Sequence, residues 1–125
     1  RTRLFPAARE KGMGIIVKRT IANGAWGGSL EGRGTTTQYM NIHERARLMA
    51  AFGPVPGAPE DRILTALGFT FAHPEIDVAL VGTTNLEHLS GNIRWIEEKL
   101  PIPAEAVEAF HLRFEEIGAD WAQLT

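Results

Sequence analysis

The sequence predicts an α/β fold built on parallel strands, and three observations support this. Two short apolar runs, residues 13–17 and 77–81, have the composition of buried strands. Helical patterns precede and follow each run, and strands that alternate with helices form parallel sheets. The second run leads through Gly82-Thr83-Thr84-Asn85 directly into an amphipathic helix, as strands do in parallel α/β proteins.

The N-terminal third predicts a helix, a strand and a long loop. Residues 4–11 are typical of the end of a helix, which Gly12 closes. The β-branched run 13–17 predicts a strand that is buried on both faces. Residues 20–40 show no periodicity and contain five glycines, which predicts a glycine-rich flexible loop, either a functional lid or plain disorder.

The rest of the chain predicts four helices around the second strand. Asn41 with Glu44 resembles a capping box, so we expect a helix to begin there and to end at Gly53-Pro54. The other helices are predicted over residues 60–72, from Leu86 to about Leu100, and from beyond Pro103 to about Trp121.

The composition is that of a globular domain and excludes several classes of protein. The chain has 125 residues, 44% of them hydrophobic and 22% charged, with a net charge of −2. This balance gives no general attraction to nucleic acid or to an anionic membrane, and no apolar run approaches the ~18 residues of a membrane span. The absence of cysteine excludes disulfides and thiolate metal sites, and it is compatible with the cytoplasmic location that we expect.

Two predicted strands are too few for a stable sheet, because each would present an unpaired edge. The sequence also begins at Arg1-Thr2-Arg3 without a methionine. We therefore expect residues 1–125 to be a single segment of a longer chain, or a chain that completes its sheet with another copy of itself.

The ends of the two predicted strands form a candidate anion site. Gly82-Thr83-Thr84-Asn85 precedes a helix, whose N-terminal N–H groups and dipole favour a phosphate. Lys18-Arg19 closes the first strand. The carboxyl ends of parallel strands meet at one edge, so we expect these segments to form the two sides of one site. The alternative is ordinary turn and cap chemistry beside a strand end that emerges into solvent.

The usual catalytic motifs are missing from this chain. Residues 27–31 fail the nucleophile-elbow pattern, because Glu31 stands where its last glycine belongs. No Walker lysine and no Gly-x-Gly-x-x-Gly follows a strand. The four histidines show no metal-ligand spacing, so no metal site is predicted. Arg113, Glu115 and Glu116 predict a solvent-exposed face of the last helix.

Three segments resemble the C-terminal part of aldo/keto reductases. They are residues 7–19, residues 72–89 with the following Asn92, and residues 113–121, and the resemblance extends over nearly the whole chain except the glycine-rich loop. The most specific of them is the strand, Gly-Thr-Thr-Asn turn and helix. The resemblance implies part of a TIM (β/α)8 barrel, in which this chain supplies the last two parallel strands and the flanking C-terminal helices.

The resemblance also implies a cofactor, NADP(H), and a small carbonyl substrate, an aldehyde or a ketone. Binding of NAD(H) is possible, because Gly82 and His88 stand where some members carry basic residues. The roles at the nicotinamide and pyrophosphate would belong to Lys18, Arg19 and Ile21. Those at the adenosine 2′-phosphate and the adenine would belong to Gly82, Thr83, Thr84, Asn85, His88 and Asn92.

No position in this chain matches the family's catalytic Asp, Tyr, Lys and His, which come from earlier strands. We therefore expect an oxidoreductase in the intact protein, with this chain as its cofactor-binding part and inactive by itself. The alternative is a non-enzymatic fragment that binds a nucleotide or assembles with copies of itself. No nucleic-acid or membrane partner is predicted.

Overall fold

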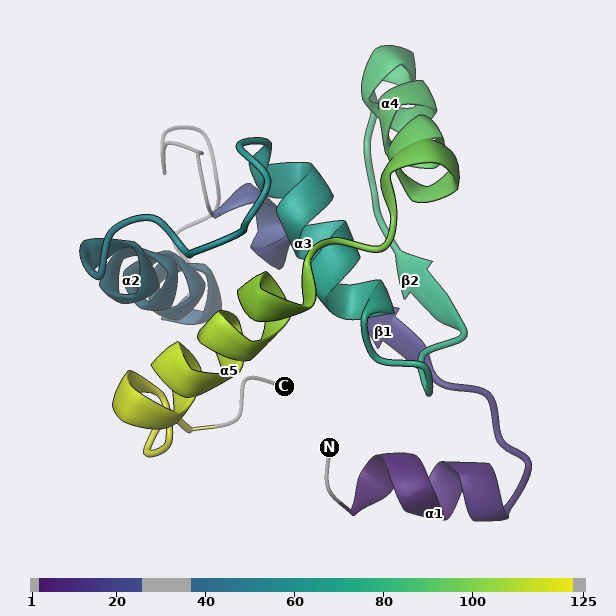
Figure 1. The fold of residues 1–125 in the computed structure, drawn as a ribbon, viewed down its shortest axis with the longest axis horizontal. Helices are drawn as coiled ribbons and strands as arrows, with labels where there is room; N and C mark the ends of the chain where they lie inside the picture. The colour runs from purple at the N-terminus through teal and green to yellow at the C-terminus, as the bar shows by residue number, and fades with distance from the viewer. Residues whose placement is uncertain (1–2, 26–36, 123–125) are drawn as a thin grey trace.

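The computed structural model describes residues 3–25 and 37–122 (Figure 1). Within them the chain forms five α-helices and a two-stranded parallel sheet, so the predicted α/β class is confirmed. The elements in order are α1 (Leu4–Glu10), β1 (Ile16–Lys18), a 3-10 turn (Ala22–Gly24), α2 (Thr37–Ala51), α3 (Arg62–Phe71), β2 (Val78–Leu80), α4 (Leu86–Lys99) and α5 (Ala104–Ile117). No helix in the described ranges is long and apolar enough to cross a membrane.

The two strands lie side by side and pair in parallel, with Ile16 opposite Val78 and Lys18 opposite Leu80 (Figure 1). The pairing is extended at its amino end by Asp77, whose carboxylate accepts a hydrogen bond of 2.7 Å from the backbone N–H of Ile15. Each strand is three residues long, shorter than the predicted runs 13–17 and 77–81. A strand extends only where a neighbouring strand offers backbone hydrogen-bond partners. Each strand here has one such neighbour among the described residues, which keeps both strands short.

The sheet has one partly covered face and one bare face. Val17 and Ala79 are half-buried, and Val17 faces a cavity that it shares with α3. Their neighbours point to the opposite face, where Ile16, Val78 and Leu80 are 64%, 43% and 56% exposed. The prediction that the first strand is buried on both faces is therefore wrong for this chain, because no described element covers the second face.

The helices pack as two pairs, α3 with α4 and α2 with α5. The best-buried side chains lie where α3 meets the segment that leads into α5: Leu67 and Ala106 are fully buried and Ile102 is 5% exposed. Gly68 permits this approach, because a Cβ at that position would lie 2.2 Å from Cγ2 of Ile102. Helix α3 therefore forms the centre of the packed part of the chain.

Several helix boundaries follow capping rules that depend on the local sequence alone. Gly12 adopts a φ of +63° just after α1, as its predicted capping role requires. Asp61 caps α3, since its carboxylate accepts hydrogen bonds from the N–H groups of Ile63 and Leu64 at 2.8 and 2.9 Å. Helix α4 begins at Leu86, as predicted.

The region between β1 and α3 differs from the predictions. Helix α2 begins at Thr37, so Asn41 lies inside it and the predicted capping box at Asn41 and Glu44 is wrong. A capping residue must itself be outside the helix, and the four residues before Asn41 are already helical. Of the predicted loop 20–40, residues 22–24 form a 3-10 turn and residues 37–40 belong to α2, while residues 26–36 lie outside the described residues.

Candidate functional site

The predicted site begins at the carboxyl ends of the two strands. The parallel register places Lys18 level with Leu80, so β1 and β2 both end at this edge of the sheet. The segment Lys18-Arg19 and the segment that starts at Val81 therefore leave the sheet on the same side, and α4 follows directly from β2 (Figure 1). The structure therefore brings the segment after β1 and the turn after β2 to one edge of the sheet, as parallel pairing predicts.

The turn after β2 is organised by side-chain hydrogen bonds. Asn85 has extended backbone angles and its side-chain oxygen accepts a 2.8 Å hydrogen bond from the N–H of Glu87, so it is the N-cap of α4. The hydroxyl of Thr83 accepts a 3.1 Å bond from the N–H of Asn85. Gly82, Thr83, Thr84 and Asn85 are all exposed. The turn thus presents a capped, accessible helix N-terminus.

The electrostatics of this helix start are mixed. The aligned peptide dipoles of α4 place partial positive charge at its N-terminus, and an anion there gains about 0.3–1 kcal/mol at an exposed site. The carboxylate of Glu87 lies in the first turn and offsets part of this positive potential. Lys18, exposed at the end of β1, contributes a positive charge on the other side of the same edge.

The backbone that follows β1 is unusual. Arg19 and Ala22 adopt left-handed φ values of 62° and 48°, a region that non-glycine residues rarely occupy. A 2.7 Å hydrogen bond from the N–H of Ala22 to the carbonyl of Arg19 closes this turn, and Ile21 lies inside it, half-buried. Two such residues in one turn mark a strained backbone, which often occurs at functional sites.

The last two predicted residues lie further along α4. Asn85, His88 and Asn92 are spaced by three and four residues, so they share one face of the helix. His88 is exposed, whereas Asn92 is only 9% exposed, two turns from the N-terminus. The structure therefore brings seven of the nine predicted residues to or near the edge of the sheet, while His88 and Asn92 extend from it along α4.

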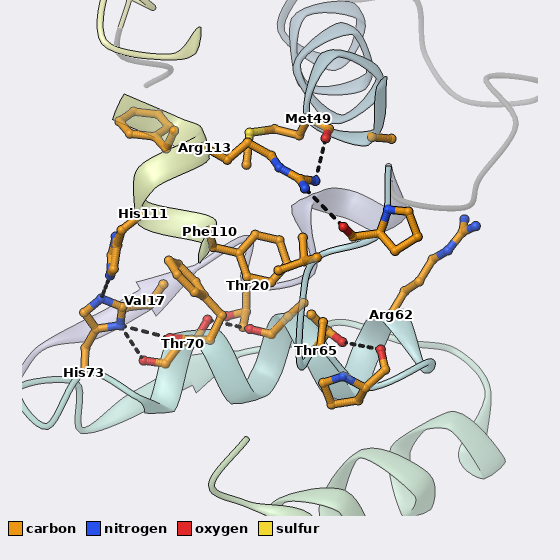
Figure 2. A pocket seen from close by; sticks show the side chains of 18 of the residues that line it. Val17, Thr20, Met49, Arg62, Thr65, Thr70, His73, Phe110, His111 and Arg113 are labelled. Carbon is orange, nitrogen blue, oxygen red and sulfur yellow. Dashed lines mark hydrogen bonds between the residues drawn. The ribbon is translucent and has the colours of Figure 1, made fainter. Parts of the chain in front are cut away.

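A second feature, which the sequence did not indicate, is a cavity of about 940 Å³. Side chains from β1, α2, α3 and α5 line it (Figure 2). Phe5 of α1 also belongs to the lining. Its lining is mainly apolar, and two of its threonines, Thr65 and Thr70, are satisfied by backbone carbonyls of their own helix or its approach. The hydroxyl of Thr20 is buried there without a hydrogen-bond partner in the described part of the chain.

Arg113 borders this cavity, and the prediction that it lies on a solvent-exposed face of the last helix is wrong. It is half-buried beside Met49 (Figure 2). Its guanidinium donates to the carbonyls of Met49 and Gly53, each at 2.9 Å, and of Pro54 at 3.3 Å. It therefore holds the C-terminal end of α2 against α5. Its position three residues after Phe110, on the apolar side of α5, was the signal in the sequence.

His73 and His111 also meet at the cavity, with their Nε2 atoms 3.2 Å apart (Figure 2). They are 38 residues apart in the sequence, so spacing gave no indication of this contact. No group of three or more His, Asp or Glu side chains in residues 3–25 and 37–122 is placed to hold a metal ion.

Comparison with known proteins adds no identification, because neither the protein-family models nor the curated proteins contain a match to this chain.

Proposed function

We propose that this chain is the cofactor-binding C-terminal segment of an aldo/keto reductase and that it binds NADP(H) at the carboxyl edge of its sheet. The observation that carries the proposal is the parallel pairing of β1 and β2, which makes Lys18-Arg19 and Gly82–Asn85 two sides of one exposed edge. A dinucleotide that spans this edge would meet cationic side chains on one side and a helix N-terminus on the other.

The phosphate-binding role of the turn is supported by the geometry around Asn85. Of the N–H groups at the start of α4 that have no partner within the helix, that of Asn85 donates to the hydroxyl of Thr83 and that of Glu87 donates to the side chain of Asn85. A phosphate would accept hydrogen bonds from the others and from the exposed hydroxyl of Thr84. Gly82 leaves room for close approach, since a Cβ there would have no described atom within 4 Å.

The partial-barrel reading is supported by the bare face of the sheet. Parallel strands are normally covered on both faces, yet Ile16, Val78 and Leu80 are exposed here. In a (β/α)8 barrel, alternate residues of each strand point into a closed interior that all eight strands fill. We propose that the bare apolar face belongs to such an interior and that further strands of a longer chain complete it.

In the intact enzyme, this segment would hold the nicotinamide so that a hydride passes between it and the carbonyl carbon of an aldehyde or ketone. The group that protonates the carbonyl oxygen would come from the rest of the barrel. The cytoplasmic location expected from the sequence belongs to the same proposal.

The direct test is a fluorescence titration of the chain with NADPH, and in parallel with NADH. We expect saturable binding that Lys18→Ala weakens several-fold, because the substitution removes an exposed charge beside the phosphates. Lys11→Ala, at a lysine just beyond α1 that is also exposed, is the matched control and should leave the affinity unchanged. A folded chain that shows no saturable binding of either nucleotide would refute the cofactor role.

One observation favours the alternative of a self-assembling fragment. The exposed face of Ile16, Val78 and Leu80, with an unpaired edge on each strand of a sheet that has two described strands, is suited to a second copy of the chain. Sedimentation or light scattering over a range of concentrations distinguishes the two functions. Association without nucleotide binding would support the fragment, whereas NADPH binding by a monomer would support the reductase segment.

A further inference from the structure

The contact between His73 and His111 joins two separate elements of the fold. His73 stands just beyond the C-terminus of α3 and His111 lies in α5. Their rings are perpendicular, with an interplanar angle of 89° and centroids 5.2 Å apart, and their Nε2 atoms are 3.2 Å from each other (Figure 2). Both rings are half-buried and line the cavity.

Hydrogen bonding fixes the tautomer of His73. Its Nδ1 lies 2.9 Å from the carbonyl oxygen of Phe69 and 3.3 Å from that of Thr70. A carbonyl oxygen only accepts hydrogen bonds, so Nδ1 must carry the proton. In the neutral ring Nε2 then holds a lone pair, and this lone pair faces His111. Without another ligand, the Nε2–H of His111 donates to it.

We propose that His73 and His111 form a two-histidine site for a divalent transition-metal ion such as Zn²⁺, bound through both Nε2 atoms. Zn–N bonds of about 2.0–2.1 Å in a tetrahedral site separate neighbouring nitrogens by about 3.3–3.4 Å. The separation here is 3.2 Å, so the rings already stand almost at the spacing of two cis ligands.

The surroundings of His73 match those of a metal ligand. Metal-binding histidines nearly always donate their second ring N–H to a carboxylate, a carbonyl or water, which orients the ring and directs its lone pair to the metal. The bond from Nδ1 of His73 to Phe69 is of this kind. On binding, the metal takes the place of the shared proton. The proton of His111 moves from Nε2 to Nδ1 through solvent, so that each ring keeps a proton on Nδ1 and binds the metal through Nε2.

The donor set selects the class of ion. Imidazole nitrogens suit Zn²⁺, Cu²⁺ and Ni²⁺, whereas Mg²⁺ and Ca²⁺ require oxygen ligands. No third His, Asp or Glu joins the pair within the described part of the chain, so water fills the remaining positions. Such a site binds more weakly than a structural zinc site with four protein ligands.

The test is a calorimetric titration of the metal-free chain with ZnCl₂. We expect one Zn²⁺ per chain, and His73→Gln and His111→Gln should each weaken binding by at least about tenfold, since loss of an outer-shell partner alone costs that much. His88→Gln, which alters an exposed histidine on α4, is the matched control and should bind like the wild type. No saturable binding up to about 1 mM Zn²⁺, or binding unchanged in both variants, would overturn the proposal.

A second measurement on the wild-type chain keeps the test decisive if either variant fails to fold, which circular dichroism would reveal. Long-range ¹⁵N NMR of the imidazole rings reports which nitrogen carries each proton. We expect the Nε2–H of His111 to be replaced by an Nδ1–H as Zn²⁺ saturates, with the Nδ1–H of His73 retained and His88 unaffected. Persistence of the Nε2–H of His111 at saturating Zn²⁺ would refute the site.

Discussion

Removal of the Arg113 guanidinium should separate the C-terminal end of α2 from α5. This group donates to the carbonyls of Met49, Gly53 and Pro54, and it lies 5.7 Å from the ring centroid of Phe52. A hydrogen bond that involves a charged group contributes about 1.5–3 kcal/mol net, and a partly exposed cation–π contact about 0.5–1 kcal/mol. Water can replace the guanidinium at the more exposed carbonyls, so these contributions do not add in full.

We therefore expect Arg113→Met, which keeps most of the aliphatic stem, to lower the free energy of unfolding by about 2–3 kcal/mol. The assay is equilibrium unfolding in urea, followed by circular dichroism. Arg94→Met removes the same group from an exposed position on α4 and should change stability by no more than about 0.5 kcal/mol.

Arg113→Lys tests the geometry of the interaction. A single ammonium group cannot hold the fork of donors that a guanidinium presents to several carbonyls, so lysine should restore only part of the loss. The guanidinium does not join α2 to α5 as described if Arg113→Met lowers the free energy of unfolding no more than Arg94→Met does, or if Arg113→Lys is as stable as the wild type.

Two further predictions concern α3 and are measured by the same urea unfolding. Leu67→Ala should destabilise the chain by about 3–5 kcal/mol, because Leu67 is fully buried, whereas Leu86→Ala at a 78% exposed position should cost about 0.5 kcal/mol or less. Similar losses at both positions would mean that α3 is not the packing centre. Gly68→Ala should also destabilise the chain, because its methyl group would meet Ile102 and overpacking costs about 1–3 kcal/mol. This cost outweighs the gain of about 1 kcal/mol that alanine brings over glycine inside a helix. Gly91→Ala, in open space on α4, should instead raise the free energy of unfolding by about 0.5–1 kcal/mol. If both substitutions changed stability in the same direction, the close approach of Ile102 to Gly68 would be contradicted.

Local features were the most predictable from the sequence. The strand, turn and helix around Asn85 were expected at the positions where they occur, because a capping side chain bonds to an N–H only two residues away. Gly12 likewise adopts the left-handed conformation that its place after a helix requires. The start of α2 was missed, because Asn41 and Glu44 also fit the interior of a helix when the residues before them are helical.

The candidate site was predictable in outline for one tertiary reason. Parallel pairing places the carboxyl ends of both strands at one edge, so two segments about 60 residues apart could be expected to meet there. The burial of Asn92 was not predictable from its spacing, because exposure depends on the neighbouring helix and not on the periodicity of α4 itself.

The sequence by itself determined the α/β class, the order of the elements and the capped turn before α4, because these depend on residues within about one helical turn of each other. Only the tertiary structure decided that Arg113 reaches the carbonyls at the end of α2, 59 to 64 residues away, and that His73 meets His111 across 38 residues. It also decided that one face of the sheet stays bare. Such contacts follow from how helices pack in space, and a local pattern contains no information about which distant group will lie opposite.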